Sequence, residues 1–147
     1  MRMPAEGFDV VHPRTVLEAL EFYSRGDCRF VAGGTALQLE WAAGLPQPER
    51  LVNLGGVAGL KSIVCGEDQI QIGALLTLAA LERHPGIATK LPLLASAIRT
   101  VAAPAIRTLA TMGGNVGGRN GCLLPVLLAL GAHVQIAGLA GRRQLPL

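Results

Sequence analysis

The sequence has few aromatic residues and no dense run of charge. Aromatic residues make up 3% of the 147 residues and charged residues 16%, whereas 50% are hydrophobic. Because rings are so rare and the 13 Lys and Arg residues are scattered, no surface for nucleic acid is indicated. The net charge of +3 therefore says little about partners. The hydrophobic half is enough for the core of one domain, or of one domain with part of another.

Cysteine is also scarce. Cys28, Cys65 and Cys122 lie far apart, and no two of them have the CxxC spacing. This pattern disfavours a zinc site or an iron–sulfur cluster held by this chain alone. Free thiols in a reducing compartment are the simplest interpretation.

A long membrane-spanning run is missing as well. The N-terminal segment has no apolar core typical of a secretory leader, so we expect a cytoplasmic protein. The stretch from Asn120 to Gly141 carries no charge and is long enough to cross a bilayer, but Pro125, His133 and Gln135 interrupt it. We interpret it as a buried helix followed by a strand, with no membrane span.

The positions of capping residues, glycines and prolines predict a mixture of helices and strands, which is typical of an α+β or mixed α/β fold. Thr15 and Glu18 have the spacing of a capping box, so a helix is expected from Thr15 to near Gly26. Two β-rich runs, Lys61–Val64 and Ile70–Ile72, predict a hairpin. The other expected elements are strands over 29–34, 49–56 and 132–138, helices over 35–44, 77–86, 91–102 and 122–131, one helical turn over 105–110, and a last hairpin that starts after residue 138.

The stretch VAGGTAL, residues 31–37, is the first candidate for a binding site. A predicted strand enters Gly33 and Gly34, and Thr35 then caps a predicted helix. Glycines allow several backbone N–H groups to face one point, and a helix N-terminus adds positive potential there. The pattern therefore suits a phosphate or pyrophosphate. A plain strand–turn–helix connection is the alternative, and by itself it is the more common one.

The stretch TLATMGGNVGGRNGC, residues 108–122, is the second candidate. Within it, Thr111 and Asn115 bracket two glycines, so that a hydroxyl and an amide lie where the backbone can approach a ligand closely. The pattern is neither the dinucleotide fingerprint nor the P-loop. A flexible linker is the alternative.

No catalytic constellation accompanies these segments. His12, His84 and His133 are scattered, and neither HExxH nor GxSxG occurs. Cys122 opens the predicted apolar helix, a place where a thiol can be activated. Its apolar neighbours favour a buried, inert thiol instead.

With both glycine segments placed, the sequence resembles the FAD-binding subunits and domains of the molybdenum hydroxylases, which include xanthine dehydrogenase and aerobic carbon monoxide dehydrogenase. The resemblance covers nearly the whole chain, in order, through HPRTVLEAL, VAGGTAL, IQIGALLTLAALE, KLPLLASAIRTVAAPAIRTLATMGGNVGG and LLPVLLALGAHVQI. It implies an α+β FAD-binding fold of the vanillyl-alcohol oxidase-like (PCMH-type) class. Two small α/β subdomains are expected, 1–56 with the AGGT loop and 57–147, with the C-terminal part of the family's domain missing.

The resemblance also implies which residues bind FAD. The first glycine segment would hold the pyrophosphate, the second would contact the phosphate–ribityl portion, and AAPAIR (102–107) would run beside the flavin ring. Cys122 stands where the family leads one to expect an Asp, which can accept a hydrogen bond from a cofactor hydroxyl. The cofactor-binding residues predicted in this way are Ala32, Gly33, Gly34, Thr35, Ala36, Thr111, Met112, Gly113, Gly114, Asn115 and Cys122, with no catalytic residue and no metal ligand.

The implied function is electron transfer in an oxidoreductase complex. Electrons from a molybdenum subunit would cross two [2Fe–2S] clusters on another subunit, reach FAD on this chain and pass to NAD⁺ or another acceptor. The chemistry would belong to the cofactor, which agrees with the lack of an acid–base pair. A homodimer is one expected assembly. Two alternatives stay open: an assembly subunit with weak or no FAD binding, which Cys122 and the short C-terminal part favour, and a stand-alone flavin reductase of the same fold.

Overall fold

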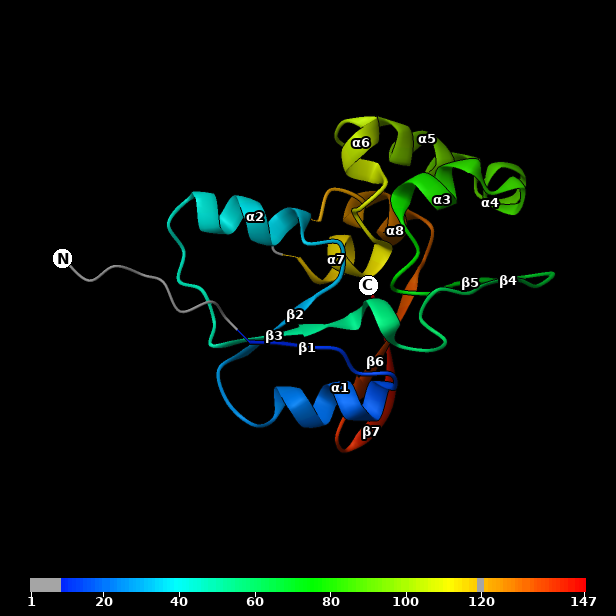
Figure 1. The fold of residues 1–147 in the computed structure, drawn as a ribbon. Coiled ribbons are helices and arrows are strands. Elements are labelled where there is room, and N and C mark those ends of the chain that lie inside the picture. The colour runs from blue at the N-terminus through cyan, green and yellow to red at the C-terminus, as the bar shows by residue number, and fades with distance from the viewer. Residues whose placement is uncertain (1–8, 119–120) are drawn as a thin grey trace.

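The N-terminal part of the chain forms a small parallel sheet with one helix on each side (Figure 1). The computed structural model describes residues 9–118 and 121–147. The strand order is β1-β3-β2, with β1 at Asp9–Val11, β2 at Cys28–Val31 and β3 at Arg50–Asn53. Parallel neighbours need crossover connections, and these are α1 (Val16–Tyr23) and α2 (Thr35–Ala42). A short 3-10 turn, η1 (Leu54–Gly56), follows β3.

The predicted capping box of α1 is present in a modified form. The Thr15 hydroxyl accepts a hydrogen bond from the Glu18 N–H at 3.1 Å, as expected. The Glu18 carboxylate accepts from the N–H of Arg14, at 2.7 Å. The helix ends at Tyr23, before the predicted stop at Gly26: the N–H of Ser24 bonds the Leu20 carbonyl at 3.0 Å, and the N–H of Arg25 closes the last turn on the Phe22 carbonyl, three residues back, at 3.2 Å. The start of this helix is therefore set by local chemistry that the sequence makes visible.

Strand β1 was not expected, because three residues are too few to show a period. It pairs with the central strand β3, and an exposed ion pair between Asp9 and Arg50 lies across the pair at 2.8 Å. The hydrogen bond to Asp9 raises the pKa of the Arg50 guanidinium. The first hydrophobic cluster lies between this sheet and α1, around Ala19, Val52 and Val57.

The middle of the chain is a hairpin followed by short helices. The hairpin of β4 (Ile63–Cys65) and β5 (Ile70–Ile72) is confirmed, with Ile63 opposite Ile72. The helices are α3 (Leu78–Arg83), α4 (Pro85–Lys90), α5 (Pro92–Thr100), α6 (Pro104–Arg107), α7 (Met112–Gly117) and α8 (Leu124–Ala129).

Prolines begin helices in this part of the chain. The prediction that Pro85 stops a helix is correct for α3, but the same residue begins α4, which was missed. Proline is tolerated there because the first N–H of a helix has no partner within it. The His84 ring supports the new start, since its Nδ1 accepts the N–H of Gly86 at 3.1 Å.

The second hydrophobic cluster joins these helices. Leu78, Leu81, Leu94 and Ile98 are fully buried at its centre. Val57 and Leu60, which follow the predicted boundary at residue 56, pack in the first cluster. The division into subdomains 1–56 and 57–147 stays a prediction.

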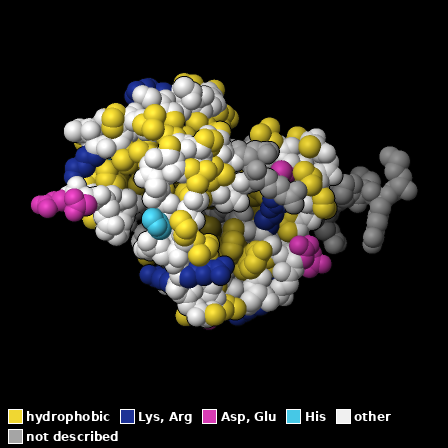
Figure 2. Space-filling model, turned by 180° about the vertical axis from the view of Figure 1, so that it is seen from behind, with side chains coloured by type: hydrophobic (Ala, Val, Ile, Leu, Met, Phe, Trp, Pro, Cys, Tyr) yellow, Lys and Arg dark blue, Asp and Glu magenta, His cyan; other side chains and the backbone are white. Residues whose placement is uncertain are grey.

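The chain continues into an exposed hairpin of β6 (His133–Gly138) and β7 (Gly141–Pro146). The expected strand over 132–138 is present, but it forms the first arm of this hairpin, whereas a separate hairpin was expected to start after residue 138. Large apolar side chains remain exposed elsewhere, including Leu39 at 73% and Leu109 at 53%. Figure 2 shows apolar side chains spread over much of one face. Among the helices that the structure describes, none is long and apolar enough to cross a membrane.

Candidate functional site

The structure brings the two glycine segments into contact. A Cβ built on Gly33 would lie 1.8 Å from the carbonyl oxygen of Leu109 and 3.2 Å from the nitrogen of Ala110. No side chain fits at such distances, so the backbone of the first segment lies directly against the residues that precede Thr111. Glycine at position 33 is explained by this approach of one backbone segment to another.

The first segment ends in a helix start that lacks a side-chain cap. Gly34 has φ = 73° and occupies the N-cap of α2, so the prediction that Thr35 caps this helix is wrong. Thr35 is the first helical residue. The N–H groups of Thr35, Ala36 and Leu37 donate no hydrogen bond to any residue within 9–118 or 121–147.

These three N–H groups form a donor set suited to an anion. The first N–H groups of a helix have no partner inside it, and the helix dipole places positive potential at this end. Phosphate oxygens bind at such positions. Among the residues that the structure describes, a Cβ built on Gly34 would meet only the Val31 side chain, at 3.8 Å, so these residues leave the turn before the donors open. The chemistry of the first segment thus fits a pyrophosphate.

The second segment is a helix where a loop was expected. Residues Met112–Gly117 form α7, and the Thr111 hydroxyl accepts the N–H of Gly114 at 3.1 Å. Glycine disfavours helices by about 1 kcal/mol per residue, so the local sequence opposes a helix here. Tertiary contacts override it: the N–H of Gly113 bonds the Ala74 carbonyl at 2.7 Å. A Cβ at Gly113 would lie 2.7 Å from the Cβ of Ala74.

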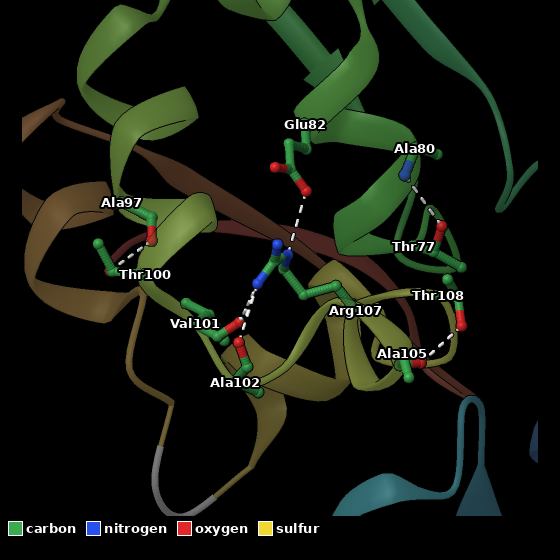
Figure 3. A network of polar contacts seen from close by, with 10 residues as sticks. All are labelled: Thr77, Ala80, Glu82, Ala97, Thr100, Val101, Ala102, Ala105, Arg107 and Thr108. Atoms are coloured by element: carbon green, nitrogen blue, oxygen red, sulfur yellow. Dashed lines mark hydrogen bonds and ion pairs between the residues drawn. The ribbon is translucent and has the colours of Figure 1, made fainter.

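An antiparallel bridge between Thr77 and Thr111 holds the start of α7 against the start of α3. The Leu78 N–H bonds the Ala110 carbonyl at 2.8 Å, and the Met112 N–H bonds the Leu76 carbonyl at 2.9 Å. The Thr77 hydroxyl caps α3 through the N–H of Ala80 (Figure 3), as Thr111 caps α7. Thr111 and Met112 are both buried, at 6% exposure each. Their side chains serve packing and capping in this structure.

Asn115 and Cys122 contact each other. The Asn115 amide oxygen accepts the N–H of Leu123 at 3.0 Å, and its nitrogen donates to the Cys122 sulfur at 3.2 Å. The prediction of a buried Cys122 is wrong: the thiol is exposed, because α8 starts at Leu124 and Leu123 takes the buried position. Both polar ends of the Asn115 amide are therefore used to tie α7 to the residues before α8.

Arg107 is a residue that the motifs did not single out. It is 7% exposed, and its guanidinium donates to Glu82 at 3.1 Å and to the carbonyls of Val101 and Ala102 at 3.0 and 2.8 Å (Figure 3). Glu82 lies on α3, 25 residues earlier in the chain. The one available signal was an arginine at the end of the apolar run AAPAIR, and nothing in the sequence pairs it with Glu82.

The segment in front of Arg107 has an unusual backbone. Ala102 has φ = 49°, the one described residue other than glycine with positive φ. The residues from Ala102 to Ile106 are exposed, so the segment presents apolar side chains to solvent just before Leu109, which Gly33 contacts. Among the residues that the structure describes, no group of three His, Cys, Asp or Glu side chains could hold a metal.

Comparisons with known proteins agree with this geometry. The family described as "FAD binding domain in molybdopterin dehydrogenase" matches residues 6–147. The nicotine 6-hydroxylase medium subunit of Paenarthrobacter nicotinovorans is 34% identical over 146 residues, which is 97% of this chain and 51% of that protein. The carbon monoxide dehydrogenase medium chain of Hydrogenophaga pseudoflava is 32% identical over 95% of this chain and 50% of that protein.

The fold is shared with a solved structure. Reconstituted CO dehydrogenase from Oligotropha carboxidovorans contains a chain with a TM-score of 0.90 and 29% identity, over 98% of this chain and 52% of that one. The protein thus has the FAD-binding fold of flavoprotein subunits, and the predicted fold class is confirmed. It belongs to the FAD-binding domain family of the molybdopterin dehydrogenases. FAD, the predicted cofactor, is the cofactor of this family. The chain spans about half the length of the relatives that it matches.

Proposed function

We propose that this chain is the FAD-binding, electron-transferring component of a molybdenum hydroxylase. The observation that carries the proposal is the uncapped start of α2 beside the backbone contact of Gly33 with Leu109, in a chain of this family. FAD supplies reversible uptake and release of electrons when bound, and the protein binds and orients it. The partners proposed are a molybdenum-cofactor subunit and a [2Fe–2S] subunit. The family description refers to a molybdopterin dehydrogenase, and the names "medium subunit" and "medium chain" of the relatives imply further subunits.

The first segment is proposed to hold the pyrophosphate. The N–H groups of Thr35, Ala36 and Leu37 would donate to its oxygens, and Gly34 leaves the approach open. The apolar residues 102–106 are proposed to lie beside the flavin ring, which is supported by their exposure and by their place in the chain shortly before Leu109, the residue that Gly33 contacts. For the second segment, Thr111 and Asn115 are proposed to act by holding α7 in place, because their polar atoms are bonded within the chain.

A charge placed at the start of α2 tests this assignment. Ala36 is exposed, and Ala36→Asp puts a carboxylate at a helix N-terminus, where it stabilises the helix. The same carboxylate repels a pyrophosphate, since like charges about 4 Å apart near a protein surface interact by about 4 kcal/mol. We expect the dissociation constant for FAD to rise by at least about tenfold, or about 1.4 kcal/mol, with no fall in melting temperature.

Ala36→Asn is the matched control, because it has the same shape without the charge. Its dissociation constant is expected to stay within about threefold of the unmodified chain, measured by quenching of flavin fluorescence. Equal binding by the Asp and Asn variants would show that the pyrophosphate lies elsewhere.

A second candidate function rests on the contact between Asn115 and Cys122. The Cys122 sulfur accepts a hydrogen bond from the Asn115 amide nitrogen, and a thiol is a poor acceptor for a cofactor hydroxyl. An assembly subunit with weak FAD binding therefore stays a candidate. Co-purification with a molybdenum subunit but without flavin would favour it. NAD⁺ as acceptor, a homodimer, a stand-alone reductase activity and a cytoplasmic location stay predictions.

A further inference from the structure

The Arg107 guanidinium connects helix α3 with the turn between α5 and α6. Its side chain is 9% exposed, so it is nearly removed from water, and Glu82 provides the balancing charge at 3.1 Å. A buried arginine without a partner would be strongly unfavourable. The other two acceptors are the carbonyl oxygens of Val101 and Ala102, on the turn between α5 and α6 (Figure 3).

This turn has a conformation that the local sequence does not favour. Ala102 has φ = 49°, in the left-handed region, where an alanine costs about 1–2 kcal/mol. Such a residue persists only when surrounding contacts fix it. The hydrogen bonds from Arg107 to the carbonyls on either side of the Ala102 nitrogen and α-carbon are contacts of that kind.

The turn is connected to the Gly33 contact by a short chain of hydrogen bonds. Arg107 ends α6, and the Ile106 carbonyl accepts the N–H groups of Leu109 and Ala110 at 3.0 and 2.8 Å. Leu109 and Ala110 are the residues against which Gly33 lies. Helix α3 closes the connection, since it carries Glu82 and its Leu78 N–H bonds the Ala110 carbonyl.

We propose that Arg107 and Glu82 are a positioning pair that fixes the 101–103 turn and the Leu109–Ala110 backbone, and so sets the distance between the two FAD-binding segments before FAD binds. The pair itself does not contact the cofactor. The inference rests on the proposed function for its effect on FAD, but its effect on the free chain does not depend on that function.

The test in the free chain is hydrogen exchange followed by mass spectrometry on the full 147 residues. Glu82→Gln keeps the shape of the side chain and an acceptor oxygen but removes the charge, and Arg107→Lys keeps the charge but loses the forked donor geometry. In both variants, the bonded amides of Leu109 and Ala110, and the Gln38 amide that bonds the Gly34 carbonyl at the start of α2, are expected to exchange at least about tenfold faster, equal to about 1.4 kcal/mol. Unchanged exchange of the Gln38 amide in a folded variant would overturn the inference.

The test with FAD uses a control that is destabilised elsewhere. Ile87 is fully buried on α4 in the second hydrophobic cluster, so Ile87→Ala lowers stability but leaves the hydrogen bonds between Arg107 and its three acceptors in place. At an equal fall in melting temperature, Glu82→Gln is expected to weaken FAD binding at least about tenfold and to change the visible circular dichroism of bound flavin, whereas Ile87→Ala does neither.

If Glu82→Gln and Ile87→Ala lower the affinity for FAD equally at the same fall in melting temperature, the Arg107–Glu82 pair has a purely structural role and the inference is overturned. If the unmodified chain binds no FAD, the proposed function fails, and hydrogen exchange alone decides whether Arg107 and Glu82 position the two segments. The two failures are therefore distinguishable.

Discussion

At the scale of single residues, glycine is required at different positions of the two segments for different structural reasons. Gly33 and Gly113 permit contact between backbone segments, with Leu109 and Ala74 respectively. Gly34 instead supplies a left-handed turn with open space beside it. Among these three, Gly34 is the glycine whose surroundings leave room for a ligand, so the site is built on one open glycine and two packing glycines.

Replacing Gly33 with alanine tests this distinction. The new methyl group would lie 1.8 Å from a backbone oxygen that cannot rotate away. We expect Gly33→Ala to lower the free energy of unfolding by about 2 kcal/mol or more, as overpacking typically does, in urea denaturation.

Gly117→Ala is the matched control, because nothing lies within 4 Å of a Cβ at Gly117 on α7. Its helix propensity should raise stability, by up to about 1 kcal/mol. An equal, small effect of both substitutions would mean that Gly33 does not lie against Leu109 as described.

The sequence identifies a residue when its structural role depends on neighbours in the chain, and not when that role depends on a distant segment. Thr15 and the two glycine segments were visible because caps and close approaches of the backbone leave local sequence patterns. Arg107 was not, since its partner Glu82 lies on another helix and no spacing encodes their contact. The helix predicted to start at Cys122 starts two residues later, at Leu124, and this difference leaves Cys122 exposed instead of buried.

At the scale of elements, local propensity failed where tertiary contacts decided the outcome. Helix α7 contains three glycines, at 113, 114 and 117, and still forms between the Thr111 cap and the Ala74 carbonyl. Helix α2 starts on Gly34 with no side-chain cap. Helix α2, which was expected to have a Thr35 cap, has no side-chain cap, whereas the second segment forms a helix capped by Thr111. The proposed pyrophosphate donors therefore lie on α2.

Removing the cap of α7 tests this account. Thr111→Val keeps the shape of the side chain and removes the hydroxyl that accepts the Gly114 N–H. We expect the free energy of unfolding to fall by about 1–2 kcal/mol, with faster hydrogen exchange within 112–117.

Thr108→Val is the control, because its exposed hydroxyl bonds only the Ala105 carbonyl. Its cost should stay within about 0.5 kcal/mol, as for most surface substitutions. Loss of a similar size in both variants would show that the Thr111 cap does not decide whether α7 forms.

At the scale of the whole molecule, the described residues form two hydrophobic clusters, and the two glycine segments contact each other through Gly33 and Leu109. One cluster supports the parallel sheet that presents α2, and the other supports α3, α5 and α7. The chain spans about half the length of its relatives, so electron transfer within a complex stays a proposal. FAD binding by the chain itself is the central claim.

A titration of the purified chain with FAD tests that claim most directly, with flavin fluorescence, visible absorbance and melting temperature followed together. We predict saturation at one FAD per chain and a shifted flavin spectrum. The chain should gain about 2.7 kcal/mol of stability when FAD is at 100 times its dissociation constant. FMN, which lacks the pyrophosphate and the adenosine, should bind more weakly. A chain that is folded by circular dichroism yet shows no saturable FAD binding up to about 1 mM would contradict the account.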